Sequence, residues 1–231
     1  MINDDDRENA KVTRFPDPKE RKKAMGAGEP VLNLPPVVKA LCLINIAVFL
    51  FGKAFPNLLT EETLYALAFM PARYSGAWSF GFSEIFSPVT HLFLHGGWMH
   101  LAINTGTLMA FGAGLEKKIG GRRLLLLYFA SGLCGALAHV LVYPGTDAPL
   151  IGASGAISGL FGGILLLMQS EGMMGQGTRK FLFFIFIWMG VSIFFGFFGV
   201  PGTENPIAWT AHIGGFVGGL LLYRPISRLR L

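Results

Sequence analysis

Residues 152–163 read GASGAISGLFGG and open an apolar stretch that continues to Gln169. The glycines at 155, 159 and 163 are four residues apart, so they lie on one face of a helix. Small residues at this spacing allow two helices in a membrane to approach each other closely. The stretch therefore predicts a membrane helix that packs against a partner helix through its glycine face.

The composition of the whole chain is that of a membrane protein. Of the 231 residues, 52% are hydrophobic and 14% are charged, and the mean hydropathy is +0.52. Soluble domains are less apolar and carry more charge. The formal charge of +5 does not indicate nucleic-acid binding, because the basic residues flank apolar runs and do not alternate with exposed aromatic residues. We expect contacts with membrane lipid and no nucleic-acid partner.

Six apolar segments predict an all-α membrane protein, a bundle of six transmembrane helices. A bilayer core of about 30 Å needs about 20 helical residues, so the fourth and sixth segments are short and should begin below the membrane surface. The polar residues 1–35 predict a mobile tail, and residues 224–231 a short basic tail, on either side of a membrane domain at 36–223. The six segments are 36–55, 97–116, 124–143, 154–169, 181–200 and 207–223.

The basic residues predict the orientation of this bundle, since loops on the cytoplasmic side carry the excess of Lys and Arg. Seventeen of the 19 basic residues fall on one side, which leaves only Lys53 and Arg73 on the other. We therefore expect both termini in the cytoplasm and the long, partly apolar loop between the first two segments at the outer interface. The seventeen are eight residues up to Lys39, then Lys117, Lys118, Arg122, Arg123, Arg179, Lys180, Arg224, Arg228 and Arg230.

Polar side chains inside membrane helices are costly, and each one needs an explanation. His100, Ser154 and His212 all lie within about two helical turns of the outer end of their segments, so they share one depth. For the other polar residues we favour hydrogen bonds between helices. These other residues are Asn45, His139 and Ser192.

Ser154 lies at the predicted start of a helix, where unpaired backbone N–H groups and the positive end of the helix dipole favour a developing oxyanion. A serine in a membrane helix can also simply bond a carbonyl one turn back. A catalytic serine needs a base, and His212 shares its helix face with Gly215 and Gly219. If these glycines pack against Gly155 and its successors, the hydroxyl and the imidazole meet.

His100 and Asn104 are four residues apart, which puts two hydrogen-bond donors on one face of the second segment. His91 and His95 form a similar pair, but two glycines follow them, so we begin the helix after His95 and assign that pair to packing and capping. The two cysteines lie inside apolar segments, and neither a metal-ligand set nor a phosphate-binding loop is present in the sequence. No cofactor or metal is expected.

Three motifs in this order on alternate segments resemble the rhomboid family of intramembrane serine proteases. They are His100-xxx-Asn104, Gly152-Ala-Ser154-Gly155 and Ala211-His212-xx-Gly215-xxx-Gly219. The resemblance implies that Ser154 is the nucleophile and His212 the general base. It also implies that His100, Asn104 and the Ser154 backbone N–H form the oxyanion hole, with Gly152, Gly155, Gly215 and Gly219 in support.

The resemblance further implies that the substrates are transmembrane proteins, cut near the outer face, and that the chain lies in a bacterial inner membrane. The sequence departs from the family pattern at Ser158, where an aromatic residue often packs on the base. This serine predicts that the His212 ring is held less tightly than by an aromatic residue, and that Ser158→Phe is tolerated or mildly activating. Two alternatives stay open: an inactive rhomboid-like protein that binds membrane helices, and a small transporter. The lack of acidic residues in the expected bundle interior and the lack of evident repeat halves argue against the transporter.

Overall fold

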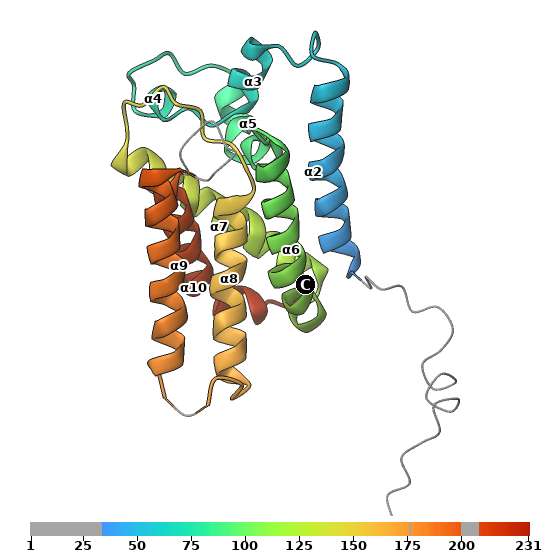
Figure 1. Ribbon diagram of the computed structural model, residues 1–231, viewed down its shortest axis with the longest axis vertical. Helices are drawn as coiled ribbons and strands as arrows, with labels where there is room; N and C mark the ends of the chain where they lie inside the picture. Colours follow the sequence, from blue (N-terminus) through green and yellow to red (C-terminus); the bar gives the residue numbers. More distant parts are fainter. Residues whose placement is uncertain (1–33, 176, 200–207) are drawn as a thin grey trace, which may run out of the picture. The chain divides into compact units, whose positions relative to one another are not determined.

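The computed structural model describes residues 34–175, 177–199 and 208–231, and the expected tail at 1–35 lies almost entirely outside this range. Six long helices form a bundle in the described part of the chain (Figure 1). They are α2 (Pro36–Ala54), α6 (Trp98–Ile119), α7 (Gly121–Val142), α8 (Ser154–Ser170), α9 (Arg179–Phe198) and α10 (Trp209–Ser227). Short helices connect α2 to α6, and these are α3 (Glu61–Leu67), α4 (Pro71–Tyr74), α5 (Ser83–Thr90) and the 3₁₀ helix η2 (His91–Phe93).

Each predicted apolar segment overlaps one long helix, which confirms the all-helical fold. The predicted bounds at residues 200 and 207 lie outside the described residues. Three described helices, α2, α7 and α9, are long and apolar enough to cross a membrane, and α8 is a shorter apolar helix. Helices α6 and α10 fall outside this class because they carry the polar residues of the predicted motifs. Helix α10 continues to Ser227, past the predicted end at Tyr223, because the side chain of Ile226 is buried against the core.

Two features at one end of the bundle fix the positions of α2, α6 and α7. Gly120 separates α6 from α7 with a φ of +83°, a conformation that glycine adopts without a steric penalty. One turn earlier, the carboxylate of Glu116 accepts hydrogen bonds from the backbone N–H groups of Val37 and Val38, at 2.9 and 2.7 Å. These are unpaired donors at the start of α2, so a side chain of α6 caps the neighbouring helix.

Helix α7 lies at the centre of the bundle and packs most extensively against α10 and α8. The buried core joins leucines of α6, α7 and α8 to Tyr128, which has no exposed surface. His139 of α7 bonds Thr210 of α10 at 2.7 Å, which confirms the expected hydrogen bond between helices. Asn45 is different, because its buried side-chain atoms have no hydrogen-bond partner among the described residues.

Helix α9 packs more loosely than the other long helices, since Ser192 is its only buried residue in the described range. It packs against α10, where Gly196 lies next to Trp209. The ring of Trp188 also lies 4.6 Å from that of Phe161 on α8 and 5.9 Å from that of Phe111 on α6. Most of its remaining phenylalanines are exposed, as is expected for side chains that face lipid.

The connection from α2 to α6 lies at the end of the bundle where α6 begins (Figure 1). It is built around Glu84, which is 3% exposed and pairs with Arg73 at 2.5 Å. The Glu84 carboxylate also accepts a hydrogen bond from the Gly81 N–H, and its backbone carbonyl accepts one from the Tyr74 hydroxyl. Trp78, Phe80, Phe82 and Phe86 remain exposed around this paired core, a distribution that suits a membrane interface.

Glu84 makes the stability of this connection depend on pH. Burial raises the pKa of Glu84, but hydrogen bonds from Arg73 and from three nearby donors outweigh it, and the net pKa lies below its ordinary value. The three donors are the Gly81 N–H, the Ser83 hydroxyl and the N–H of Glu84 itself. The ionised carboxylate therefore stabilises the fold above the unfolded-state pKa of about 4.3, and this contribution is lost as the pH falls through the folded-state pKa. We expect Glu84→Gln to cost about 1–3 kcal/mol at neutral pH and to weaken the acid dependence.

Thermal unfolding of the purified protein in detergent, between about pH 7 and about pH 3, measures this effect. The midpoint of the wild-type protein should fall more steeply on acidification than that of the Glu84→Gln variant. Glu62→Gln is the matched control, because Glu62 is exposed on α3. Identical acid profiles for the wild type and Glu84→Gln would show that Glu84 is not the group responsible.

Candidate active site

Ser154 is the first residue of α8, as predicted, and its side chain is half-buried. Gly152, two residues before it, has a φ of +110°, a conformation that residues with a side chain rarely adopt. Ala153 then turns the chain into the helix without a side-chain cap. The first N–H groups of α8 are therefore free of a capping side chain at the position of the serine.

The segment before Ser154 is held by the connection between α2 and α6. Phe69 and Leu150 form an antiparallel bridge with two hydrogen bonds of 3.1 and 2.8 Å. The N–H of Gly152 donates to the carbonyl of His91 at 2.8 Å. These backbone hydrogen bonds fix the turn that presents Ser154.

His100 and Asn104 of α6 lie against this turn. A Cβ added to Gly152 would lie 2.6 Å from Nε2 of His100 and 3.9 Å from Nδ2 of Asn104. Only a glycine therefore fits at 152. The two predicted donors, His100 and Asn104, both lie next to this glycine. Asn104 Nδ2 donates to the His100 carbonyl at 2.9 Å, while its buried Oδ1 has no partner among the described residues.

Helices α8 and α10 meet through their glycines, as the spacing predicts. A Cβ on Gly215 would lie 2.0 Å from the carbonyl oxygen of Gly155, and one on Gly219 would lie 2.1 Å from that of Gly159. The two backbones are therefore in direct contact. This contact begins one residue after Ser154 and includes Ala211, the residue before the half-buried His212.

Ser154 and His212 thus lie at adjoining positions of two helices in backbone contact. The hydrogen bonds of the described residues do not include one between the two side chains. Hydrogen bonds between catalytic residues are often long before substrate binds, so this geometry is compatible with a nucleophile and its base.

A family model for the rhomboid domain matches residues 82–229 of this chain, which is more than half of its length. The chain belongs to the rhomboid family. The matched range contains α6, α7, α8, α9 and α10, and with them every residue of the three motifs. Membership of the family confirms the resemblance that the motifs indicate.

Curated rhomboids from distant organisms are similar to this one. It is 37% identical over 133 residues to Rhomboid protease GluP of Bacillus subtilis, covering 57% of this chain and 24% of that protein. It is 34% identical over 140 residues to Rhomboid-like protease 5 of Toxoplasma gondii, covering 61% and 16%. Inactive RHOMBOID-like protein 8 of Arabidopsis thaliana is 34% identical over 150 residues, covering 63% and 40%. The chain therefore spans less than half of each of these relatives.

Ser158 of this rhomboid is buried one helical turn after Ser154. Its hydroxyl donates to the carbonyl of Ser154 at 2.7 Å, and the residue has no exposed surface. The structure argues against the expected tolerance of Ser158→Phe, because a large ring in a filled site costs about 1–3 kcal/mol in strain. A hydrogen bond from a serine hydroxyl to the carbonyl one turn back was the alternative considered for Ser154. In the structure, Ser158 makes a hydrogen bond of this kind.

His91 supports the site in a way that the motifs do not reveal. It is buried, its Nδ1 lies 2.8 Å from the Ser87 carbonyl, and its ring is 5.7 Å from that of Phe69. Burial lowers the pKa of His91 to about 4, so the imidazole is neutral at neutral pH and donates from Nδ1. Packing was the correct prediction for this residue, but its backbone contact with Gly152 has no signal in the sequence.

Proposed function

We propose that this rhomboid is an intramembrane serine endopeptidase with Ser154 as nucleophile and His212 as general base. The observation that carries the proposal is that the glycines on both sides of Ser154 are closely packed. Gly152 lies against His100 and Asn104 on one side, and Gly155 lies against α10 next to His212 on the other. These contacts support a shared location of the proposed nucleophile, base and two donors at one end of the bundle.

The chemistry follows the general scheme of acyl transfer. The Ser154 hydroxyl attacks a peptide carbonyl of the substrate while His212 accepts its proton, and the carbonyl oxygen becomes an oxyanion. The oxyanion receives hydrogen bonds from the Ser154 N–H and from the side chains of His100 and Asn104. His212 then passes the proton to the leaving amine, and water releases the acyl group from Ser154 in a second round.

We propose that all six long helices cross the membrane, with α6, α8 and α10 entering from the outer face. The excess of basic residues at the opposite ends supports this orientation. The substrates would be transmembrane segments of other proteins, unwound where they reach Ser154. Because similar proteins occur in bacteria and in eukaryotes, the bacterial inner membrane stays a prediction.

The second candidate is a rhomboid that binds membrane helices without cutting them, which the inactive Arabidopsis relative brings into view. One experiment separates the two candidates and tests the orientation. A membrane-impermeant fluorophosphonate, added to spheroplasts that express the full chain, should label the wild-type protein and leave Ser154→Ala unlabelled. Labelling only in inside-out vesicles would reverse the orientation. Labelling in neither preparation would favour the binding protein.

A further inference from the structure

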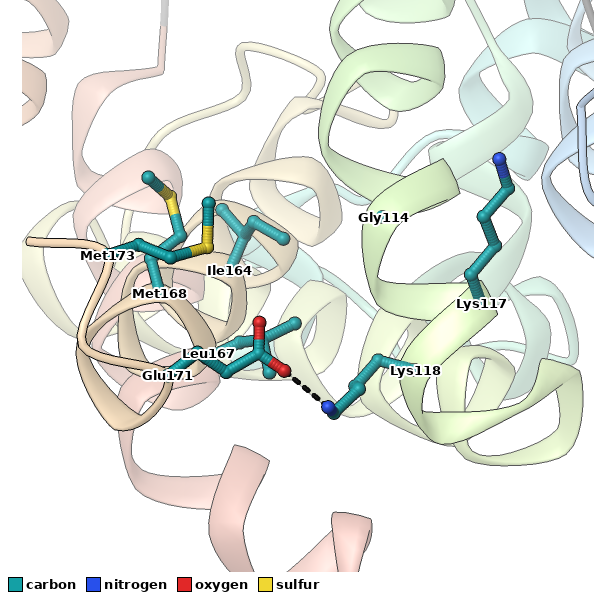
Figure 2. A pocket seen from close by; sticks show the side chains of 8 residues that line it. All are labelled: Gly114, Lys117, Lys118, Ile164, Leu167, Met168, Glu171 and Met173. Atoms are coloured by element: carbon teal, nitrogen blue, oxygen red, sulfur yellow. Dashed lines mark ion pairs between the residues drawn. The ribbon is translucent and has the colours of Figure 1, made fainter. Parts of the chain in front are cut away.

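A groove lies between the C-terminal halves of α6 and α8, at the opposite end of these helices from His100 and Ser154 (Figure 2). Its volume is about 350 Å³, comparable with small-ligand sites. Apolar residues form its wall and charged residues form its rim. The wall is Gly114, Ile164, Leu167, Met168 and Met173, and the rim is Lys117, Lys118 and Glu171.

The absence of a side chain at Gly114 keeps this groove open. Gly114 is exposed, and a Cβ added there would lie 3.2 Å from Cδ1 of Ile164, across the groove. A larger side chain at 114 would fill the space. The wall is therefore an apolar slot between two helices, and its lining suits a hydrocarbon chain.

The rim carries a net positive charge at the end of α6. Lys118 extends across the groove and pairs with Glu171, whereas Lys117 points away from this pair (Figure 2). The two ammonium groups and the one carboxylate of the rim sum to one net positive charge, and Lys117 makes no ion pair with a residue that the structure describes. Basic pockets between helices on the cytoplasmic side of a membrane are where anionic lipid headgroups bind.

We propose that this groove binds one anionic phospholipid. An acyl chain lies in the slot along Ile164 and Leu167, and the phosphate binds the two lysines, replacing Glu171 as the partner of Lys118. An apolar slot with two lysines on its rim matches an amphiphile with a negative headgroup. The site is separate from the proposed serine, so its test does not depend on proteolysis.

The experiment measures the binding of dioleoyl phosphatidylglycerol and dioleoyl phosphatidylcholine to the full chain by native mass spectrometry. The wild-type protein should retain one phosphatidylglycerol in preference to phosphatidylcholine. Lys117→Gln and Lys118→Gln should each weaken phosphatidylglycerol binding about fivefold, as a lysine near anionic lipid is worth about 1 kcal/mol. Glu171→Gln should strengthen it, because the competing carboxylate is removed.

A second pair of variants tests the slot apart from the charge. Gly114→Leu should abolish the retained lipid with both lysines intact. Gly106→Leu is its matched control on the same helix, since a Cβ on the exposed Gly106 has nothing within 4 Å, and it should bind like the wild type. Equal retention of the two lipids by the wild type, or unchanged binding in Gly114→Leu, would overturn the proposal in favour of general attraction to the membrane surface.

Discussion

Replacement of Ser154 or His212 by alanine is expected to abolish cleavage of a transmembrane substrate while leaving the protein folded. Removing a nucleophile or its base eliminates the covalent route, and such changes in serine proteases lower kcat by at least about 10⁴-fold. Both side chains are only half-buried, so their loss should cost little stability. The measurement is cleavage by the purified variants, followed on gels, with thermal unfolding as a check of the fold.

Asn104→Ala provides the graded comparison for this prediction. One oxyanion donor among several is worth about 100 to 1,000-fold in rate, so this variant should retain measurable cleavage. Wild-type rates in Ser154→Ala would show that the nucleophile has been assigned to the wrong residue. Ser158 would then be the next serine to test, since its hydroxyl lies one helical turn away.

Gly215→Ala is expected to be among the most destabilising single changes in this rhomboid, although it adds only one methyl group. The new carbon would lie 2.0 Å from the Gly155 carbonyl oxygen, and this oxygen belongs to a helix backbone that cannot turn aside. Helices α8 and α10 would have to separate, and such overpacking costs about 3 kcal/mol or more. Thermal unfolding in detergent should show a large fall in the midpoint.

Gly106→Ala is the matched control, because the same change on α6 meets open space. There the gain in helix propensity should stabilise the protein by about 0.8–1 kcal/mol or leave it unchanged. Equal midpoints for the two alanine variants would mean that α8 and α10 are not in the close contact described.

Much of the bundle could be predicted because membrane helices are encoded locally. Apolar runs of sufficient length predict the long helices, and the helix start predicted at Gly97, after His95, lies one residue before the observed start of α6 at Trp98. The contact of α8 with α10 also follows from sequence, since the four-residue spacing of small residues appears in both helices. Periodicity therefore accounts for the arrangement around Ser154 and His212.

The connection between α2 and α6 could not be predicted in the same way. Its ion pair joins Arg73 to Glu84, and its bridge joins Phe69 to Leu150, which lies on the far side of two long helices in the sequence. Such contacts depend on tertiary packing and leave no periodic pattern. The surroundings of Ser158 could not be predicted either. The family pattern drew attention to this position, but it did not indicate that the side chain is fully buried.

The contact between α8 and α10 also determines when the proposed site can exist during synthesis. The ribosome adds Ser154 almost sixty residues before His212, and α9 lies between them. At about 5–20 residues per second, the serine waits several seconds before its base has been made. With the proposed roles of Ser154 and His212, a nascent chain in which α10 has not yet been inserted beside α8 has a nucleophile without its base, and it cannot cleave the membrane proteins around the translocation machinery.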